Sequence, residues 1–306
     1  MLAPVLLFAF KRAHELQQTL SALRANYLAA ETELYVFVDG PRRDDEVDKV
    51  NAVHAVVNSI DGFKSVHRVY SKHNIGCADS IIAGVTQILK QHPSVIVLED
   101  DVVTTPNFLD FMNQSLRLYA FVPQVFSIGG YTFPFRKPDQ YANDGYFFQR
   151  TCAWGWGIWA DRWNQVDWSL DDFDAFMANP LARRQFNAGG SDRVRMLKRA
   201  QTRDIDAWDI RLCYAEYKAG GYTLYPTISK TINIGVDSPD STTEVVYDRY
   251  RPILDSGHQR VFALPNLVEV HPGYARQFRR KFSIPVRIWN KLLTYGTVVF
   301  RRSKRA

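Results

Sequence analysis

Three acidic residues follow an apolar run in the stretch VIVLEDDVVTTPNF. Glu99, Asp100 and Asp101 come directly after Leu98, the last residue of that run. Neighbouring carboxylates repel one another by about 1 kcal/mol per pair at roughly 4 Å in water, and by more near a protein surface. Hard divalent ions such as Mg²⁺ and Mn²⁺ prefer carboxylate oxygens, and one or two carboxylates commonly hold them together with substrate phosphates. The triplet therefore predicts a metal site that serves a nucleotide diphosphate; an acidic turn that caps the next helix is the alternative.

Apolar runs of strand length alternate with helical patterns through the first half of the chain. We predict strands over 5–10, 34–40, 65–70 and 95–98. This βαβ order implies an α/β fold, with a mostly parallel central sheet that helices cover on both faces. Ligands bind such sheets beyond the carboxyl ends of the strands. Asp39 ends the second strand and the acidic triplet ends the fourth, so both stand where a ligand is expected.

Local patterns predict how the residues around the triplet are arranged. Alternation along an extended chain predicts Glu99 and Asp101 on one side and Asp100 on the other. Further on, Thr105 and Pro106 have the residue types of an N-cap and a first helical position. We therefore expect the next helix to begin there.

The stretch TRDIDAWDIRLCYAEYKAGGYTLYP predicts a helix and then a strand in the second half. The helix is expected from about Asp204 to Ala219, and the Gly-Gly pair after it should end it. Trp208 and Leu212 lie at helical spacing and mark a packing face. Asp209 is therefore predicted to sit beside the buried stripe of this helix.

The net charge of +6 comes from the end of the chain. Residues 276–306 hold ten of the 38 Lys and Arg and no Asp or Glu, which leaves 28 basic against 32 acidic side chains elsewhere. Interleaved apolar residues such as Ile288 and Trp289 are typical of a segment that lies on an anionic membrane surface. A helix packed on the domain with a solvated end is the alternative. Nucleic-acid binding is not expected, because no recognition motif accompanies the charge.

The sequence predicts a cytoplasmic protein that is peripheral to the membrane through its tail. No apolar run approaches the length of about 20 residues that a spanning helix needs. The opening residues MLAPVLLFAF are a short apolar run whose basic residues follow it, so we predict a buried strand rather than a signal peptide. Cys77, Cys152 and Cys213 lack metal-type spacing and fit reduced thiols.

Four short motifs, PVLLFAFKR, VFVDG, SKHNIG and LEDD, follow one another along the first half. Over roughly 4–237 the chain resembles nucleotide-sugar-dependent glycosyltransferases of the GT-A fold. It is most similar to the inverting type with an EDD version of the DxD motif, as in N-acetylglucosaminyltransferase I and related bacterial enzymes. The resemblance implies a catalytic domain over 1–237, with a nucleotide-binding half over 1–130 and an acceptor half over 131–237. An extension over 238–275 and the basic tail over 276–306 would follow.

The resemblance implies a nucleotide site built from residues of the first half. Phe8 would line the pocket, Arg12 would reach the nucleotide, Asp39 would read the uracil edge, His73 would contact the base and Asp100 would face the nucleotide. Each of three residues also has an alternative interpretation. Asp39 could make a turn, His73 could be an ordinary loop residue and Arg12 could form a surface ion pair.

The resemblance also implies the metal ligand and the general base. Glu99 would face the donor sugar, and Asp101 would be the direct ligand of Mn²⁺ or Mg²⁺. The acid that follows a Trp in the second half would be the base, which implies Asp209. A positioned carboxylate that takes the proton of an acceptor hydroxyl typically contributes 10²-fold to 10⁴-fold. Asp204 and Asp206 remain alternatives for this role.

Two further stretches of the second half are given roles by the resemblance. In RTCAWGWGIWADRW it implies that Gly155 and Trp156 line the sugar and acceptor pocket, while Trp154 and Trp159 are predicted to be core residues. Core packing is the alternative for all of these tryptophans. The polar stretch NIGVDSPDSTTE, residues 233–244, is expected to order over bound donor and exclude water.

The sequence as a whole predicts an inverting, metal-dependent glycosyltransferase. Its donor would be a nucleotide-diphosphate sugar, with a UDP-sugar favoured and UDP-GlcNAc as the specific candidate. Its acceptor would be a hydroxyl of a glycan or of a lipid-linked acceptor. A sugar nucleotidyltransferase is one alternative, although FAFKRAHE lacks the Gly-rich loop that normally follows the first strand of that class. A non-catalytic module that binds a membrane surface is the other.

Overall fold

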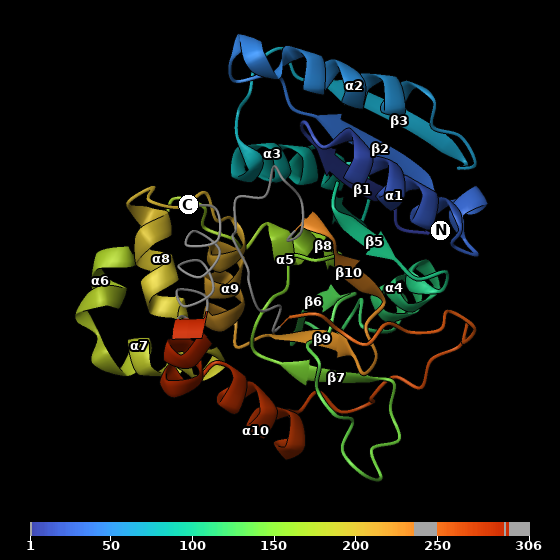
Figure 1. Cartoon of the computed structure of the whole chain (residues 1–306). Coiled ribbons are helices and arrows are strands. Elements are labelled where there is room, and N and C mark those ends of the chain that lie inside the picture. The colour runs from blue at the N-terminus through green and yellow to red at the C-terminus, as the bar shows by residue number, and fades with distance from the viewer. Residues whose placement is uncertain (1, 236–249, 291, 294–306) are drawn as a thin grey trace.

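An eight-stranded sheet runs through the centre of the protein (Figure 1). The computed structural model describes residues 2–235, 250–290, 292 and 293. In the order of the sheet, the strands are β3 (Ser65–Tyr70), β2 (Glu33–Val38), β1 (Val5–Ala9), β4 (Ser94–Glu99), β8 (Trp156–Trp159), β6 (Val125–Gly129), β9 (Tyr222–Pro226) and β7 (Gly145–Phe148). Four of the seven neighbouring pairs are parallel, and the antiparallel pairs all involve β7 or β8. The predicted α/β fold with a mostly parallel sheet is confirmed.

Helices cover both faces of this sheet, as expected. The helices are α1 (Ala13–Arg24), α2 (Val47–Asn58), α3 (Cys77–Leu89), α4 (Phe108–Leu118), α5 (Ala160–Trp163), α6 (Phe173–Ala178), α7 (Pro180–Phe186), α8 (Arg193–Gln201), α9 (Asp209–Lys218) and α10 (Pro272–Lys281). Of these, α6, α7 and α8 pack with α9 around a separate apolar cluster. Two more strands, β5 (Val102–Thr104) and β10 (Thr231–Asn233), form a small antiparallel sheet of their own. Within the described residues, no helix combines the length and the apolar character that crossing a membrane requires.

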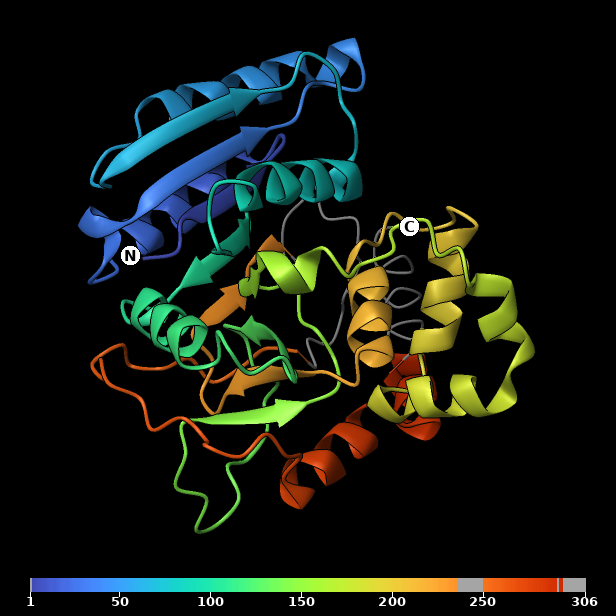
Figure 2. The same ribbon diagram turned by 180° about the vertical axis from the view of Figure 1, so that it is seen from behind.

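The side chains of β1 alternate between two separate cores. Val5 and Leu7 pack in the core beneath α1, α2 and α4, whereas Leu6 and Phe8 pack in the core beneath α3 and α9. Figures 1 and 2 show α1 and α2 on one side of the first strands and α3 on the other. Because both sides of β1 are buried, its sequence is an unbroken apolar run.

The four strands predicted for the first half are all present. Their bounds differ from the predicted ones by at most two residues, and the third, Ser65–Tyr70, matches the prediction. The strand expected after Gly220 and Gly221 is β9. Gly220 has a φ of +61°, the left-handed conformation that commonly follows a helix.

The predicted start of the helix after the triplet is wrong by two residues. Helix α4 begins at Phe108, and Asn107 rather than Thr105 precedes it. The chain before it is held in extended pairing, since the backbone N–H of Thr105 donates to the carbonyl of Lys230 at 2.8 Å just beyond β5. Strand β5 was not predicted, because its partner β10 lies more than a hundred residues away in sequence.

The helix predicted from Asp204 begins only at Asp209. Asp206 explains the difference, because its Oδ2 accepts hydrogen bonds from the backbone N–H groups of Cys77 at 3.1 Å and Ala78 at 3.5 Å. These are donors at the start of α3 that have no partner within that helix. The segment before Asp209 therefore caps α3 and does not extend α9.

The first part of the basic tail belongs to the folded domain. Tyr274 and Phe278 of α10 are 1% exposed, and their rings stack on Tyr146 and Phe148 of β7 at centroid distances of 3.6 Å. Residues 276–281 thus belong to the packed helix that was the alternative for this tail, with their arginines exposed. Stacked rings at this spacing bury a large apolar area and fix α10 against the sheet.

Glu216 of α9 is fully buried in the fold. Its Oε1 accepts a hydrogen bond from Thr223 Oγ1 at 2.8 Å. Burial raises the pKa of Glu216 from its usual value near 4.5 to about 8, although the charge of Arg193 acts in the opposite direction. The folded protein therefore holds a proton here that the unfolded chain releases between these two pH values.

Glu216→Gln is expected to reduce the pH dependence of stability. In the wild type, the free energy of unfolding should fall as the pH rises between about 4.5 and 8, by up to roughly 1.4 kcal/mol per pH unit. Glutamine keeps an acceptor oxygen for Thr223 and has no proton to lose. Urea unfolding of both proteins across this range measures the effect. Equal slopes for the two proteins would contradict it.

Candidate active site

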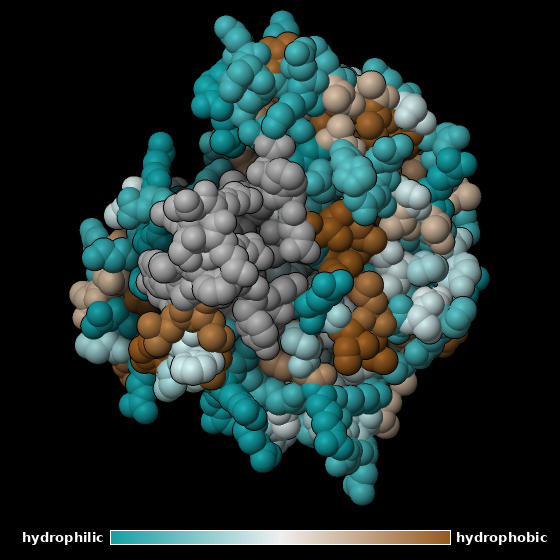
Figure 3. Space-filling model, viewed as in Figure 1, coloured by the Kyte–Doolittle hydropathy of each residue, from teal (hydrophilic) through white to brown (hydrophobic). Residues whose placement is uncertain are grey.

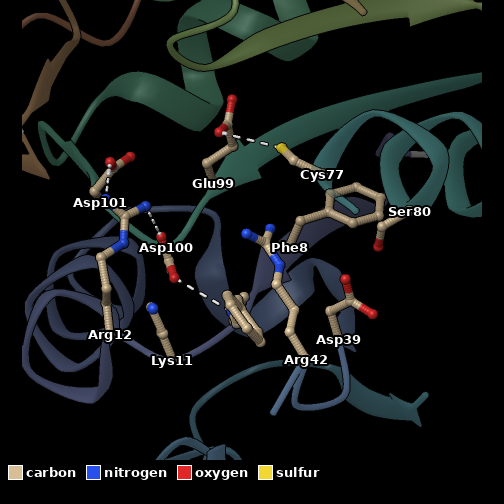
Figure 4. Close-up of a pocket in the computed structure, with 12 residues that line it drawn as sticks. Phe8, Lys11, Arg12, Asp39, Arg42, Cys77, Ser80, Glu99, Asp100 and Asp101 are labelled. Atoms are coloured by element: carbon tan, nitrogen blue, oxygen red, sulfur yellow. Dashed lines mark hydrogen bonds and ion pairs between the residues drawn. The ribbon is translucent and has the colours of Figure 1, made fainter. Parts of the chain in front are cut away.

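Six of the ten predicted site residues line one cavity at the carboxyl ends of β1, β2 and β4. The cavity has a volume of about 290 Å³ (Figure 4). The six residues are Phe8, Arg12, Asp39, Glu99, Asp100 and Asp101. This is the edge of a parallel sheet where ligands bind.

Arg12 joins two carboxylates of the triplet. Its Nη1 lies 2.7 Å from Asp101 Oδ2, and its Nη2 donates to Asp100 Oδ1 (Figure 4). The second oxygen of Asp100 accepts the backbone N–H of Phe10 at 3.3 Å. The Arg12 side chain is only 20% exposed, so this is not the surface ion pair of the alternative interpretation. Arg12 holds the two aspartates in place from the end of β1.

The predicted separation of Asp100 from its neighbours is wrong. Glu99, Asp100 and Asp101 all line the same cavity. Strand β4 ends at Glu99 and the next two residues form a turn into β5, so the alternation of an extended strand no longer applies. The turn brings all three carboxylates to one ligand site.

Arg12 is the cation that pairs with the acidic triplet, while Arg42, which also lines the cavity, donates to Asn74. Burial, together with the charges of Asp101 and Asp100, raises the pKa of Glu99 to about 8. Burial also raises the pKa of Asp100 to about 6, despite the opposing charge of Arg12. Lys11 cannot compensate, since its Nζ lies 2.7 Å from Glu46 Oε1. Such a site favours either a proton or a bound cation.

A hard divalent ion fits the oxygen donors and the charge of this site. Mg²⁺ and Mn²⁺ are commonly held by one or two carboxylates, with water and substrate phosphates completing the coordination. Among the described residues, no group of three or more His, Cys, Asp or Glu is arranged as a metal site. The residues that line the cavity include carboxylates of the kind that such ions use.

Asn233, the first residue of the donor loop predicted over 233–244, makes a contact with Asp101 that the sequence did not predict. Its Nδ2 donates to Asp101 Oδ1 at 3.0 Å, and the backbone N–H of Ile234 donates to the Asp101 carbonyl at 2.8 Å. Gly235 follows directly, and a Cβ on it would collide with the Asp101 carboxylate and with Arg12. The pairing of β10 with β5 creates these contacts. Residues 236–244 of the predicted donor loop lie outside the described residues.

Asp39 holds the loop before α3 at the side of the cavity. Its Oδ1 accepts from Gly40 at 3.0 Å and Ile75 at 3.1 Å, and its Oδ2 accepts from Gly76 at 3.1 Å, all through backbone N–H groups. Asp39 therefore performs the turn role of its alternative interpretation while it also lines the cavity. His73 is exposed and is not among the lining residues.

Asp209 opens α9 close to the triplet without lining the cavity. Its charge contributes to the raised pKa of Glu99, so the two carboxylates influence each other. Burial raises the pKa of Asp209, and the charge of Arg150 partly opposes this. Asp204 is exposed and accepts from Thr202, and Asp206 caps α3. Asp204 and Asp206 are thus engaged in other contacts, whereas the environment of Asp209 raises its pKa.

The tryptophan-rich stretch is arranged differently from the prediction. Trp156 is 1% exposed and packs against Trp208 and Trp163, so the structure places it in the core rather than on a sugar-binding surface. Trp154, predicted to be core, is partly exposed and packs against Tyr131. The chain enters strand β8 at Trp156, so that residue is sandwiched between the sheet and α9. Trp159 is buried, as predicted.

Gly155 has a structural position near the end of β6. It has a φ of +76°, which favours glycine, and its carbonyl accepts the backbone N–H of Gly130 at 2.6 Å. A Cβ here would lie 2.9 Å from Thr231 Cγ2. The structure does not bring Gly155 to the cavity of the triplet.

No protein-family model and no curated protein matches this chain. Among solved structures, it is similar to TarS of S. aureus, with 12% identity over 47% of this chain and 24% of that one and a TM-score of 0.31. It is also similar to mouse xyloside xylosyltransferase 1, with 11% identity over 71% of this chain and 81% of that one and a TM-score of 0.35. A third similar structure is galactosyltransferase LgtC in complex with donor and acceptor sugar analogues, with 12% identity over 72% of each chain and a TM-score of 0.38. The chain thus spans about a quarter of the TarS chain. Likenesses this distant do not assign a family.

Proposed function

We propose that this protein is an inverting glycosyltransferase that uses a divalent cation and a nucleotide-diphosphate sugar. The observation that carries the proposal is the triplet of partly buried Glu99 and buried Asp100 and Asp101, whose negative charge Arg12 balances only in part. The triplet lies where parallel sheets bind nucleotides. The motif order that resembles the EDD type of GT-A glycosyltransferases supports the same reaction. It also favours a UDP-sugar, with UDP-GlcNAc as the specific donor.

Asp101 is the proposed ligand of Mn²⁺ or Mg²⁺. Arg12 and Asn233 hold its two oxygens from either side, which fixes the direction of the carboxylate before the donor arrives. When bound, the cation would neutralise the charge that develops on the departing diphosphate. Glu99, which has no charged partner of its own at hydrogen-bond distance among the described residues, is proposed to face the donor sugar.

Asp209 is the proposed general base. Its carboxylate would take the proton of an acceptor hydroxyl while the hydroxyl oxygen forms a bond to the anomeric carbon. The bond from that carbon to the diphosphate breaks, and the nucleoside diphosphate leaves. Attack from the face opposite the leaving group inverts the anomeric centre, as in single-displacement glycosidases. The raised pKa of Asp209 supports this role, because a base needs appreciable proton affinity.

The acceptor is proposed to be a hydroxyl of a glycan or of a lipid-linked molecule, and the protein to work as a peripheral enzyme at the cytoplasmic face of a membrane. This location is supported by the composition of residues 276–306, which include ten Lys or Arg and no Asp or Glu. Basic segments are attracted to anionic lipid surfaces.

Asp101→Asn tests the metal site. Donor hydrolysis with Mn²⁺ should appear in the wild type for one sugar of a UDP-, GDP- and CMP-sugar panel and disappear with a chelator. It should fall about 100-fold or more in Asp101→Asn, because a lost Lewis-acid contact is worth several kcal/mol. Asp61→Asn removes an exposed carboxylate of a surface ion pair and is the matched control. Chelator-insensitive turnover, or equal rates in all three proteins, would contradict the metal role.

Asp209→Asn tests the general base. With a suitable acceptor, the transfer rate should fall 10²-fold to 10⁴-fold, while the affinity for UDP and Mn²⁺ stays unchanged. Asp204→Asn, which changes an exposed carboxylate in the preceding segment, should leave both quantities at wild-type values. Single-turnover transfer and calorimetric UDP binding measure the two effects. Full transfer activity in Asp209→Asn would exclude it as the base.

Asn233→Ala tests the support of Asp101. Loss of the hydrogen bond from Nδ2 frees one oxygen of the carboxylate, so the Mn²⁺ concentration for half-maximal activity should rise about 10-fold to 100-fold. The maximal rate at saturating Mn²⁺ should change less. An unchanged Mn²⁺ requirement would show that Arg12 alone positions Asp101.

A further inference from the structure

A short helical segment beyond α10 turns its apolar side to the solvent. Residues 284–290, 292 and 293 are helical. The exposed fractions are 61% for Ile284, 54% for Ile288, 63% for Trp289 and 59% for Leu292. Figure 3 shows apolar side chains gathered at the lower left of the molecule, where the chain continues past α10 in Figure 1. These four residues are called the outward face below.

The less exposed side of the same segment consists of Val286, Arg287 and Asn290. Arg287 is partly buried, and its Nη1 donates to Ser191 Oγ at 2.9 Å. Ser191 Oγ donates in turn to the carbonyl of Phe282 at 2.5 Å. Asn290, one helical turn after Arg287, is also less exposed than the outward face. A helix on the surface of a globular protein normally has the reverse arrangement, with apolar residues toward the core.

The chain next to the outward face carries exposed cations. Arg276, Arg279 and Arg280 of α10 are exposed just before it. The sequence from 276 to 306 contains no Asp or Glu. A protein partner could cover an apolar face. Here, however, the charged residues next to the face in the sequence are all cations. An anionic membrane matches both features, because its headgroups are negative and its acyl chains are apolar.

We infer that the outward face binds the surface of a membrane that contains anionic lipids. The three described arginines of α10 would contact the headgroups, while the isoleucines and Leu292 enter the boundary of the acyl chains. Trp289 suits that depth, because its ring is apolar and its indole N–H can remain hydrogen-bonded at the interface. The described part of the segment is too short to span a bilayer, and we place it in the plane of the surface.

The segment is tied to the candidate base through a chain of contacts. Asp192, next to Ser191, forms a two-pronged ion pair with Arg150 at 2.9 and 3.1 Å. Arg150 also lies over the ring of Phe282 at 4.1 Å and lowers the pKa of Asp209 through its charge. Membrane binding would therefore hold the acceptor side of the site near the lipid surface. This second step rests on the proposed function and implies an acceptor with a lipid anchor.

Vesicle co-sedimentation of the full chain tests the inference. The protein should bind vesicles of equal parts phosphatidylcholine and phosphatidylglycerol, bind vesicles of phosphatidylcholine alone much more weakly, and dissociate as NaCl is raised. The double variant Ile288→Ser and Trp289→Ser should bind the anionic vesicles about tenfold or more weakly. Phe121→Ser is the matched control, since Phe121 is 97% exposed elsewhere on the surface and should be dispensable.

Several outcomes would overturn the inference. The wild type could fail to bind anionic vesicles at low salt, or it could bind neutral and anionic vesicles equally. The double variant could also bind anionic vesicles as well as the wild type does. A wild-type dimer in analytical ultracentrifugation that the double variant loses, without vesicle binding, would assign the outward face to a second copy. Melting temperatures equal to wild type exclude misfolding as the cause. Asp101→Asn and Asp209→Asn should bind vesicles normally, so failure of the proposed reaction and failure of the membrane surface give different results.

Discussion

The site depends on the contact between the guanidinium of Arg12 and two of three neighbouring carboxylates. Glu99, Asp100 and Asp101 share a cavity in which burial weakens hydration of their charges. Arg12 contacts two of them and leaves the third without a charged partner at hydrogen-bond distance among the described residues. Removing charged groups from water is costly unless opposite charge accompanies them. The fold tolerates this arrangement because a proton, or a bound cation, completes it.

The architecture follows from the need to bring that guanidinium to the carboxylates. Strands β1 and β4 are parallel neighbours, and their register pairs Phe8 with Glu99. Arg12 and the two aspartates therefore emerge at the same edge of the sheet. The small β5–β10 sheet then brings Asn233 to the opposite side of Asp101. Segments separated by more than two hundred residues in sequence thus share the task of orienting one carboxylate.

The sequence predicted those features of the fold that depend on a local pattern of residues. The apolar runs of β1, β2 and β4 made these strands and the edge of the sheet predictable, with Asp39 and the acidic triplet at that edge. Phe8 and Arg12 were implied only by the resemblance to GT-A glycosyltransferases. The misses have a common physical cause, which is long-range pairing. The start of α4 depends on Lys230, the start of α9 depends on a cap for α3, and Asn233 reaches Asp101 only through β10. No local pattern carries these contacts.

The tryptophans and the tail show a different limit. Composition showed that the tryptophan-rich stretch and the basic tail are unusual. It did not show which tryptophan is buried, because that depends on where strand β8 begins. The strand begins at Trp156, so this ring is buried and Trp154 is partly exposed. In the tail, charge and aromatic content did not distinguish α10, which packs on β7, from the following segment, which faces outward. Whether such residues are buried depends on the elements that pack against them, and the sequence of one element does not show which elements those are.

The most direct test of the charge balance is the number of protons released when Mn²⁺ and UDP bind at pH 7. The pKa of Glu99 is raised to about 8, so this carboxyl holds a proton at neutral pH that a neighbouring cation should expel. Isothermal titration in buffers of different ionisation enthalpy, corrected for Mn²⁺ binding to free UDP, measures the release. The account predicts a release by the wild type that is largely lost in Glu99→Gln. Binding without proton release, or equal release by both proteins, would contradict it.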